Sequence, residues 1–210
     1  MNKKLIVFDF SGTLAKEPTK NIPAFFAGLK KNGCDLNSKN QKEFLNFLKE
    51  SLSKSMDRYA LSQRVAAFFT KELDGDLIKL VQDNIVFPLF DDVKEVSSLP
   101  IKKAILTDAS PFLIDLGRFE KSFSVFTPQI TTYRKPDERA FQCVLDRCGA
   151  KAKETVMVGN DLYEDIIPAK NMGMTVILLD REGKIPEQKG IFKASSMREV
   201  GGYLEYLKSL

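Results

Sequence analysis

Acidic, hydroxyl and basic side chains stand at several points of the chain where a short apolar run ends. Asp9 follows the apolar run Leu5–Phe8 directly, and Gly12 comes three residues later. A carboxylate at the end of a buried strand is able to act as a nucleophile or as a metal ligand, and a turn at a glycine exposes backbone amides that hold an anion. An aspartate that only caps a turn has the same local sequence, so both interpretations stand for this segment.

Two further segments offer groups that match an anionic substrate. Thr107 and Asp108 follow the apolar residues Ala104–Leu106, which places a hydroxyl at a second strand end. Lys135 comes just before Pro136, a residue that favours the first turn of a helix. An ammonium group there is able to neutralise both a carboxylate and a bound phosphate, and a solvated loop lysine is the plainer alternative.

Carboxylates recur after the apolar run Val156–Val158, where Asn160, Asp161 and Asp165 follow. In a helix, Asp161 and Asp165 lie on one face because they are four residues apart, and like charges there repel unless a cation bridges them. A hard cation that takes oxygen ligands, above all Mg²⁺, resolves this repulsion. In the alternative interpretation Asp161 caps the helix and Asp165 is solvated.

The composition excludes several kinds of chemistry. The 210 residues contain no histidine, which removes histidine bases, Ser-His-Asp and Cys-His nucleophiles, and histidine zinc sites. Three cysteines complete neither a four-cysteine zinc site nor a disulfide framework, so we expect a reducing compartment. The net charge of +4 comes without a basic stripe, so no nucleic-acid partner is expected. The first apolar run is too short for a signal peptide or a membrane helix, which predicts a soluble, cytoplasmic protein with no membrane partner.

The sequence predicts alternating strands and helices as the elements that position these groups. Apolar runs without alternation predict strands buried on both faces, hence a parallel sheet with helices on each side. The expected fold class is α/β, a doubly wound parallel sheet of Rossmann-like type, in which the polar residues past the strand ends share one rim. The expected strands are Leu5–Phe8, Ala104–Leu106, Ser124–Phe126, Val156–Val158 and Thr175–Leu179.

Several helices are expected between and after these strands. Pro136 and Gly149 mark the start and the end of one helix, and Leu162–Met172 forms another that bends at Pro168. The pair Gly201-Gly202 predicts a turn before a terminal helix.

The stretch 16–90 differs from the rest because it has helical patterns and no clear strand. We expect a helical cap domain over 16–90, inserted into an α/β core domain made of 1–15 and 91–210. Its helices are predicted from Asn21 to Gly33, around the apolar residues Phe44–Leu52, and over Tyr59–Phe69.

Taken in order, these segments resemble the motifs of the haloacid dehalogenase-like (HAD) hydrolase superfamily. Four motifs at strand ends are far more specific than any one of them, and the resemblance extends from Leu5 to about Leu179. The insertion between the first two motifs resembles the helical cap of one large branch of that superfamily. The matching pieces are Asp9–Leu14, Thr107 after Ile105 and Leu106, Arg134–Asp137, Gly159–Asp161 with Asp165, and Pro168–Met174.

The resemblance implies a mechanism and assigns roles to residues. Asp9 is implied as the nucleophile that forms an aspartyl-phosphate, while Thr107 and Lys135 bind the phosphoryl oxygens. Mg²⁺ is implied between Asp9, the backbone carbonyl of Ser11 and carboxylate from the segment 160–165. The implied function is a Mg²⁺-dependent phosphatase for a small phosphorylated metabolite, with the cap excluding water and selecting the substrate.

Two positions depart from the family's pattern. Typical family phosphatases have, where Ser11 stands, an aspartate that protonates the leaving group and then activates water. A serine hydroxyl is a poor acid or base, so its presence is expected to cost about 10²–10⁴ in rate unless another group, such as Glu17, replaces the aspartate. Asn160 stands where many members have an aspartate, so either Asn160 or Asp161 is expected to face the metal.

Two other functions remain open. Family dehalogenases and phosphonate-cleaving members also lack that aspartate, but they usually carry tyrosine or alanine where Ser11 stands. Lys135, together with the pair Asp161 and Asp165, favours phosphate over those bonds. A non-catalytic binding or regulatory domain is the third interpretation, and it explains the serine but not the retained nucleophile Asp9.

Overall fold

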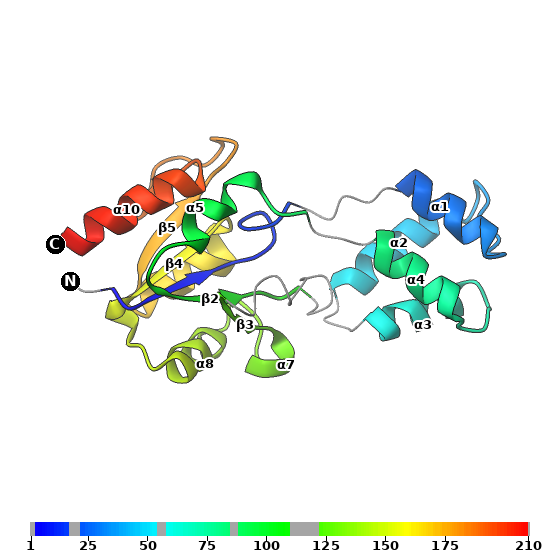
Figure 1. The fold of residues 1–210 in the computed structure, drawn as a ribbon, viewed down its shortest axis with the longest axis horizontal. Helices are drawn as coiled ribbons and strands as arrows, with labels where there is room; N and C mark the ends of the chain where they lie inside the picture. Colours follow the sequence, from blue (N-terminus) through cyan, green and yellow to red (C-terminus); the bar gives the residue numbers. More distant parts are fainter. Residues whose placement is uncertain (1–2, 17–21, 54–57, 85–87, 110–121, 210) are drawn as a thin grey trace. The chain divides into compact units, whose positions relative to one another are not determined.

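The computed structural model describes residues 3–16, 22–53, 58–84, 88–109 and 122–209. Six strands form one parallel sheet in the order β3-β2-β1-β4-β5-β6 (Figure 1). This order, which reverses on either side of a central β1, is that of a doubly wound α/β sheet and confirms the predicted fold class. The strands are β1 (Leu5–Phe8), β2 (Lys102–Leu106), β3 (Ser124–Phe126), β4 (Thr155–Gly159), β5 (Thr175–Leu179) and β6 (Phe192–Ala194).

The central strand is buried on both faces, as its unbroken apolar run predicts. Leu5 and Val7 pack into one hydrophobic cluster with residues of α8, among them Phe141. Ile6 and Phe8 point to the opposite face and are also inaccessible to solvent. Figure 1 shows α8 on one side of the sheet and α5 and α10 on the other, so helices cover both faces.

Helix α8 (Glu138–Cys148) begins and ends where the sequence predicts. The Asp137 carboxylate accepts a hydrogen bond from the backbone N–H of Arg139 and caps the helix, and Gly149 ends it in the left-handed conformation with φ of 64°. The other helices of this part are α5 (Lys94–Ser97), α7 (Pro128–Thr131), α9 (Ile167–Asn171) and α10 (Met197–Ser209), with short 3₁₀ turns at Asp91–Val93 and Ala152–Glu154.

Two local expectations need correction, and one strand was not expected. The predicted helix over 162–172 is a π-helical turn at Leu162–Ile166 followed by α9. Strand β6 was not predicted, because Lys193 at its centre interrupts any apolar run. Gly201 and Gly202 lie inside α10 rather than before it, since buried apolar residues on both sides of the pair, Val200 and Leu204, keep the helix packed on the core.

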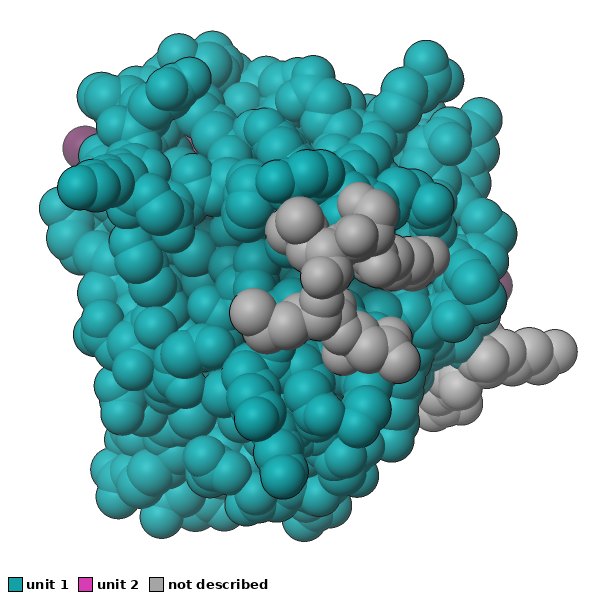
Figure 2. Space-filling view, turned by 90° about the vertical axis from the view of Figure 1, so that its left-hand side faces the viewer, with its two compact units in different colours: residues 1–16, 89–108, 117–210 teal, residues 17–88, 109–116 magenta. Residues whose placement is uncertain are grey.

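The chain separates into two compact units. Residues 1–16, 89–108 and 117–210 form unit 1, which contains the sheet, and residues 17–88 and 109–116 form unit 2. Figure 2 shows one face of unit 1, which joins segments from before and after the insertion. None of the helices in the described ranges is long and apolar enough to cross a bilayer.

Unit 2 is helical and has a hydrophobic core of its own. The ring of Phe44 lies at its centre, with ring centroids 5.1 Å from Phe68 and 4.9 Å from Phe69. Phe25, Phe26 and other buried apolar side chains complete the cluster. The helices are α1 (Ile22–Lys31), α2 (Gln41–Ser53), α3 (Arg58–Phe68) and α4 (Gly75–Asn84), of which the sequence predicted the first three.

Candidate active site

The parallel register brings three strand ends to one edge of the sheet. Phe8, the last residue of β1, pairs with Ile105 of β2 and with Val158 of β4. The residues just past these strands, Asp9, Thr107 and the segment that begins at Asn160, therefore share the carboxyl edge of the sheet. This edge is where doubly wound sheets bind their ligands.

Lys135 connects the groups at this edge. Its Nζ donates to Asp9 Oδ1 at 2.6 Å and to Asp165 Oδ1 at 2.5 Å. All three side chains are buried, and that of Lys135 is 3% exposed. Charge-assisted hydrogen bonds inside a protein are among the strongest polar contacts, so this cluster holds the loop after β1, the loop before α8 and the turn after β4 in one arrangement.

The electrostatics of the cluster follow from one ammonium shared by two carboxyl groups. Burial by itself lowers the pKa of Lys135, but the charges of Asp9 and Asp165 outweigh burial and the pKa is raised. Burial raises the pKa of Asp165, and the charge of Asp9 raises it further against the opposing effect of Lys135. Lys135 therefore stays charged while the carboxyl groups are incompletely compensated, which favours an additional cation at this edge.

Asn160 turns toward the nucleophile candidate. With its amide oriented to satisfy its neighbours, Nδ2 donates to the carbonyl O of Ser11 and to Thr13 Oγ1, each at 2.9 Å, and to Asp9 Oδ2 at 3.1 Å. Three oxygen atoms therefore converge on the position of this amide. The structure thus brings together Asp9, Ser11 and Asn160, which the sequence assigned to the metal site.

Asp161 lies apart from this group. Its side chain is exposed, and Oδ1 accepts hydrogen bonds from the backbone N–H groups of Tyr163 at 2.7 Å and Glu164 at 2.9 Å. Asp165 is buried instead, and its Oδ2 accepts from the backbone N–H of Asp161 at 3.1 Å. The shared helical face expected for the two carboxylates is wrong, because Asp161 has an extended backbone and caps a π-helical turn.

Two glycines permit the close packing of these groups. Gly12 has φ of +81°, and a Cβ atom there would lie 2.6 Å from the side-chain amide of Asn160. A Cβ atom at Gly159 would collide with the carboxylate of Asp165. Any side chain at either position would therefore displace a group of the cluster.

The remaining assigned residues are Thr107 and Asp108, which follow strand β2. Thr107 is buried, and its backbone N–H donates to the carbonyl O of Phe126 at 3.0 Å, which continues the pairing of β2 with β3. Asp108 accepts from the backbone N–H of Lys135 at 3.4 Å. Burial raises the pKa of Asp108, although Lys135 opposes this shift.

The sequence interpretation overlooked two contributors. Thr13 is fully buried and bonds to Asn160 through its hydroxyl, a role that its position inside the first motif could have suggested. Glu164 lies within electrostatic reach of Lys135 and Asp108, and burial raises its pKa. Glu17, the suggested replacement acid, lies outside the described residues.

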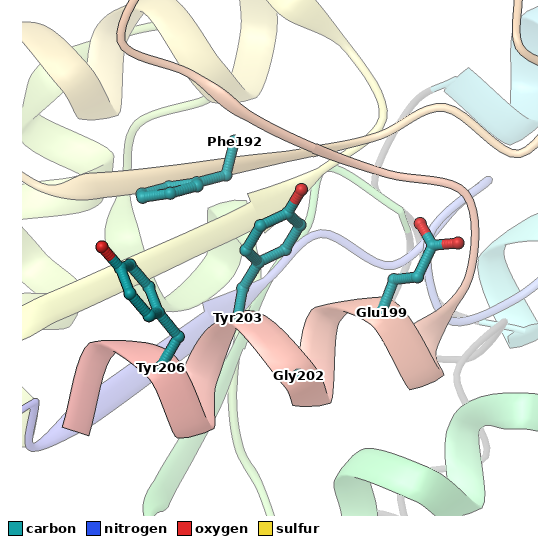
Figure 3. Close-up of a pocket in the computed structure, with 5 residues that line it drawn as sticks. All are labelled: Phe192, Glu199, Gly202, Tyr203 and Tyr206. Atoms are coloured by element: carbon teal, nitrogen blue, oxygen red, sulfur yellow. The ribbon is translucent and has the colours of Figure 1, made fainter. Parts of the chain in front are cut away.

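A hollow on α10 and β6 offers a contrasting surface. Figure 3 shows the rings of Tyr203, Tyr206 and Phe192 along it, with Glu199 at one end. Its one carboxylate is already engaged, because Glu199 accepts from the backbone N–H and the hydroxyl of Ser195. This apolar hollow shares no residue with the cluster around Lys135, and no lysine or aspartate lines it, so the carboxyl edge is the candidate active site.

A sequence profile of the haloacid dehalogenase-like hydrolase family matches residues 6–179. The match covers most of the chain, so the chain belongs to that family and is an enzyme of the hydrolase class. The resemblance drawn from the motifs is thereby confirmed.

Several relatives carry phosphatase names. A glyceraldehyde 3-phosphate phosphatase of Methanothermobacter thermautotrophicus is 41% identical over 70 residues, which are 33% of this chain and 31% of that protein. The protein of that name from Methanocaldococcus jannaschii is 32% identical over 122 residues, 54% of each chain. A ribulose-1,5-bisphosphate 5-phosphatase of Halopiger xanaduensis is 23% identical over 231 aligned positions, with 98% of this chain and 96% of that protein covered. The matched stretch thus spans about a third of the first of these relatives and about half of the second.

Solved structures of the family share the fold over nearly the whole chain. A 2-haloacid dehalogenase of Pseudomonas syringae aligns with a TM-score of 0.74 and 18% identity, covering 99% of this chain and 100% of that one. A HAD phosphatase of Thermococcus onnurineus aligns with a TM-score of 0.68 and 21% identity, covering 97% and 98%. At these identities the likeness shows the fold alone.

Proposed function

We propose that the protein is a Mg²⁺-dependent phosphatase that hydrolyses a small phosphorylated metabolite through Asp9. The buried Lys135 that bonds both Asp9 and Asp165 carries this proposal. A lysine beside a carboxylate nucleophile supplies the positive charge that phosphoryl transfer requires. The phosphatase names of the relatives support the same substrate class.

The oxygen atoms at the carboxyl edge fit a hard cation. Among the described residues no three acidic or cysteine side chains converge to hold a metal by themselves. Asp9 Oδ2 and the carbonyl O of Ser11 nevertheless converge on the amide of Asn160, which has an oxygen of its own to offer. Mg²⁺ takes few protein ligands and keeps several waters, so Asp9, Ser11 and Asn160, with Asp165 nearby, are the residues that would hold it.

The chemistry proposed for Asp9 has two steps. In the first, a carboxylate oxygen of Asp9 bonds to the substrate phosphorus while the bond from phosphorus to the leaving oxygen breaks. In the second, water bonds to the phosphorus, the bond to Asp9 breaks, and inorganic phosphate leaves. Lys135, the Thr107 hydroxyl and the backbone amides around Gly12 counter the charge of the phosphoryl oxygens, and Mg²⁺ when bound neutralises phosphoryl charge and orients the substrate.

Ser11 restricts the substrates that react well. Its hydroxyl does not protonate a leaving alkoxide near neutral pH, so the leaving oxygen must take its proton from solvent. Substrates whose leaving group is stable as an anion, such as aryl phosphates or phosphoanhydrides, are therefore expected to react faster than alkyl phosphates. In this proposal the helical unit 2 acts as the cap that selects among them.

The cellular setting belongs to the same proposal. All three cysteines, Cys34, Cys143 and Cys148, are free thiols, which supports a reducing cytoplasm. A small phosphorylated molecule is the proposed partner, and no nucleic-acid or membrane partner is proposed.

The test is hydrolysis of an aryl phosphate by the purified full chain, with Mg²⁺ or with a chelator. We expect Mg²⁺-dependent release of phosphate and a slower reaction with an alkyl phosphate of similar size. Chloride release from 2-chloropropionate and cleavage of a phosphonate are measured in parallel. Halide or phosphonate turnover without phosphate release would replace the proposal by one of those reactions, and no turnover of any substrate would leave the binding-domain interpretation.

A further inference from the structure

Arg181 makes an unusual set of contacts beside the loop that carries Asp9. Its Nη1 and Nη2 donate to the two carboxylate oxygens of Asp92 at 2.9 and 3.0 Å, and Nη2 also donates to the backbone carbonyl of Thr13 at 3.0 Å. The guanidinium lies over the ring of Phe90, with Cζ 3.8 Å from the ring centroid. Its planar fork thus bonds to two other segments at once, which a lysine cannot do in the same geometry.

The residues on either side of this contact are themselves anchored by hydrogen bonds. Arg181 follows Asp180, whose side chain is 4% exposed and accepts from the backbone N–H groups of Lys184 at 3.0 Å and Ile185 at 2.8 Å. Lys193 pairs with the same carboxylate at 2.9 Å. Asp92 is anchored in addition by the backbone N–H of Met197 at 2.9 Å. Arg181 therefore presents its donors from a rigid part of unit 1.

The carbonyl that it holds belongs to the turn after the nucleophile. The backbone N–H groups of Leu14 and Ala15 both donate to the carbonyl O of Phe10, at 2.9 and 2.8 Å, and that of Gly12 donates to Ala15. Thr13 is fully buried, so its carbonyl needs a partner. Its hydroxyl already bonds to Asn160, so Thr13 is held from the Asn160 side by its side chain and from the Arg181 side by its backbone.

The same place is where the insertion leaves unit 1. Leu89 pairs with Ala15, and the backbone N–H of Phe90 donates to the carbonyl O of Leu14 at 3.0 Å. Arg181 contacts both of these segments, through Thr13 on one and through Phe90 and Asp92 on the other. The two chain segments of unit 1 that flank residues 17–88 are therefore tied together beside the loop after Asp9.

We infer that Arg181 is a positioning residue that holds the turn 10–15, and through it Asp9, Gly12 and the Ser11 carbonyl, in their reactive arrangement. Its contact to the Thr13 carbonyl and its clamp on Asp92 carry this assignment. Because small displacements of reacting groups are costly, loss of this contact lowers turnover without a direct contact between Arg181 and the substrate. The expected effect of Arg181 on the rate rests on the proposed phosphatase activity. Its expected effect on the turn 10–15 rests on the geometry alone.

The first test is hydrogen exchange in Arg181→Met. The backbone amides of Gly12, Leu14, Ala15 and Phe90 should exchange about tenfold faster or more, while amides of the central strand β4 keep their rates. Lys3→Met is the matched control, since Lys3 is a buried cation that likewise donates to a backbone carbonyl, that of Lys153, but not in the nucleophile loop. Unchanged exchange at the four amides in Arg181→Met would overturn the inference.

The second test is steady-state kinetics with an aryl phosphate. In Arg181→Met we expect kcat to fall by about 10- to 100-fold with KM changed less than about threefold, because the effect is on the geometry of Asp9. Arg181→Lys should recover part of kcat, since it restores the charge beside Asp92 but not both contacts. Wild-type kcat in a variant whose turn exchanges faster would also overturn the inference. An inactive wild type would refute the proposed function, and the exchange experiment would still decide whether Arg181 holds the turn.

Discussion

Buried lysines lie at both ends of the same sheet, and their partners differ. At the carboxyl edge, Lys135 donates to the carboxylates of Asp9 and Asp165. At the amino edge, Lys3 donates to the backbone carbonyl of Lys153 at 2.8 Å and to the hydroxyl of Thr175 at 2.6 Å. Lys103 there donates to the carbonyl groups of Leu99 and Ile101 at 2.7 and 3.1 Å.

The pKa of each lysine reflects this difference. Burial lowers the pKa of Lys3 and that of Lys103, whereas two carboxylates raise the pKa of Lys135 despite its deeper burial. Lysines at the amino edge stabilise backbone carbonyl groups and serve the fold. The lysine at the carboxyl edge instead compensates two buried carboxyl groups, one of which is the proposed nucleophile, so the partners of a buried charge and not its burial alone point to a candidate functional site.

The largest expected effect comes from removing the reactive carboxylate at the carboxyl edge. Asp9→Asn should lower kcat/KM for an aryl phosphate by more than about 10³-fold, because an amide oxygen is a poor nucleophile and Lys135 loses one of its two carboxylates. Phosphate release against time measures this loss, with circular dichroism as the control for folding. Residual activity near that of the wild type would show that Asp9 is not the nucleophile.

Replacing the lysine at each edge tests the comparison directly. Lys135→Met should lower kcat by about 10²-fold and the free energy of unfolding by about 3–5 kcal/mol near pH 8, because two buried carboxyl groups are left without their cation. The pKa of Asp165 is already raised and rises further in this variant, so its charged form destabilises the fold above that pKa. The deficit should therefore shrink as the pH falls toward 4, which urea unfolding at several pH values measures. A deficit that grows on acidification would contradict this account.

Asp161 and Asp165 allow the same comparison within one motif. Asp165→Asn should lower kcat by about 10-fold or more, since it removes a carboxylate from Lys135. Asp161→Ala should change kcat less than about threefold and lower the free energy of unfolding by about 1 kcal/mol, because it removes only a helix cap. Titration of activity with Mg²⁺ distinguishes them, with a weaker Mg²⁺ response expected in Asp165→Asn alone. A shift of the Mg²⁺ response in Asp161→Ala instead would place Asp161 at the metal.

The smallest expected effect is at the amino edge. Lys3→Met should leave kcat unchanged and alter the free energy of unfolding by about 1 kcal/mol, the scale of a buried hydrogen bond. Because the pKa of Lys3 is lowered in the folded protein, the unfolded chain binds more protons between that value and the ordinary pKa of 10.5. The free energy of unfolding of the wild type should therefore rise with pH through this window, and that of the variant should not show this rise. Urea unfolding of both proteins between pH 8 and 10 provides the measurement.

Most of the fold could be predicted from local patterns. The unbroken apolar runs of β1, β4 and β5 require burial on both faces, and Asp137 and Gly149 delimit α8 through their own capping chemistry. The π-helical turn after Asp161 could not be predicted, because its backbone follows from the burial of Asp165 against Lys135. Strand β6 pairs in parallel with β5, a long-range contact that its own short sequence does not predict.

The sequence by itself determined which residue types stand at the strand ends, and with them the family, since buried strands and turn residues leave short, readable patterns. Only the tertiary structure decided that Asn160 rather than Asp161 faces Asp9, that one ammonium serves two carboxyl groups, and that Arg181 bonds to the turn after Asp9. These contacts join residues 30 to 168 positions apart. Their geometry depends on how separate segments meet in space, and no local pattern encodes that meeting.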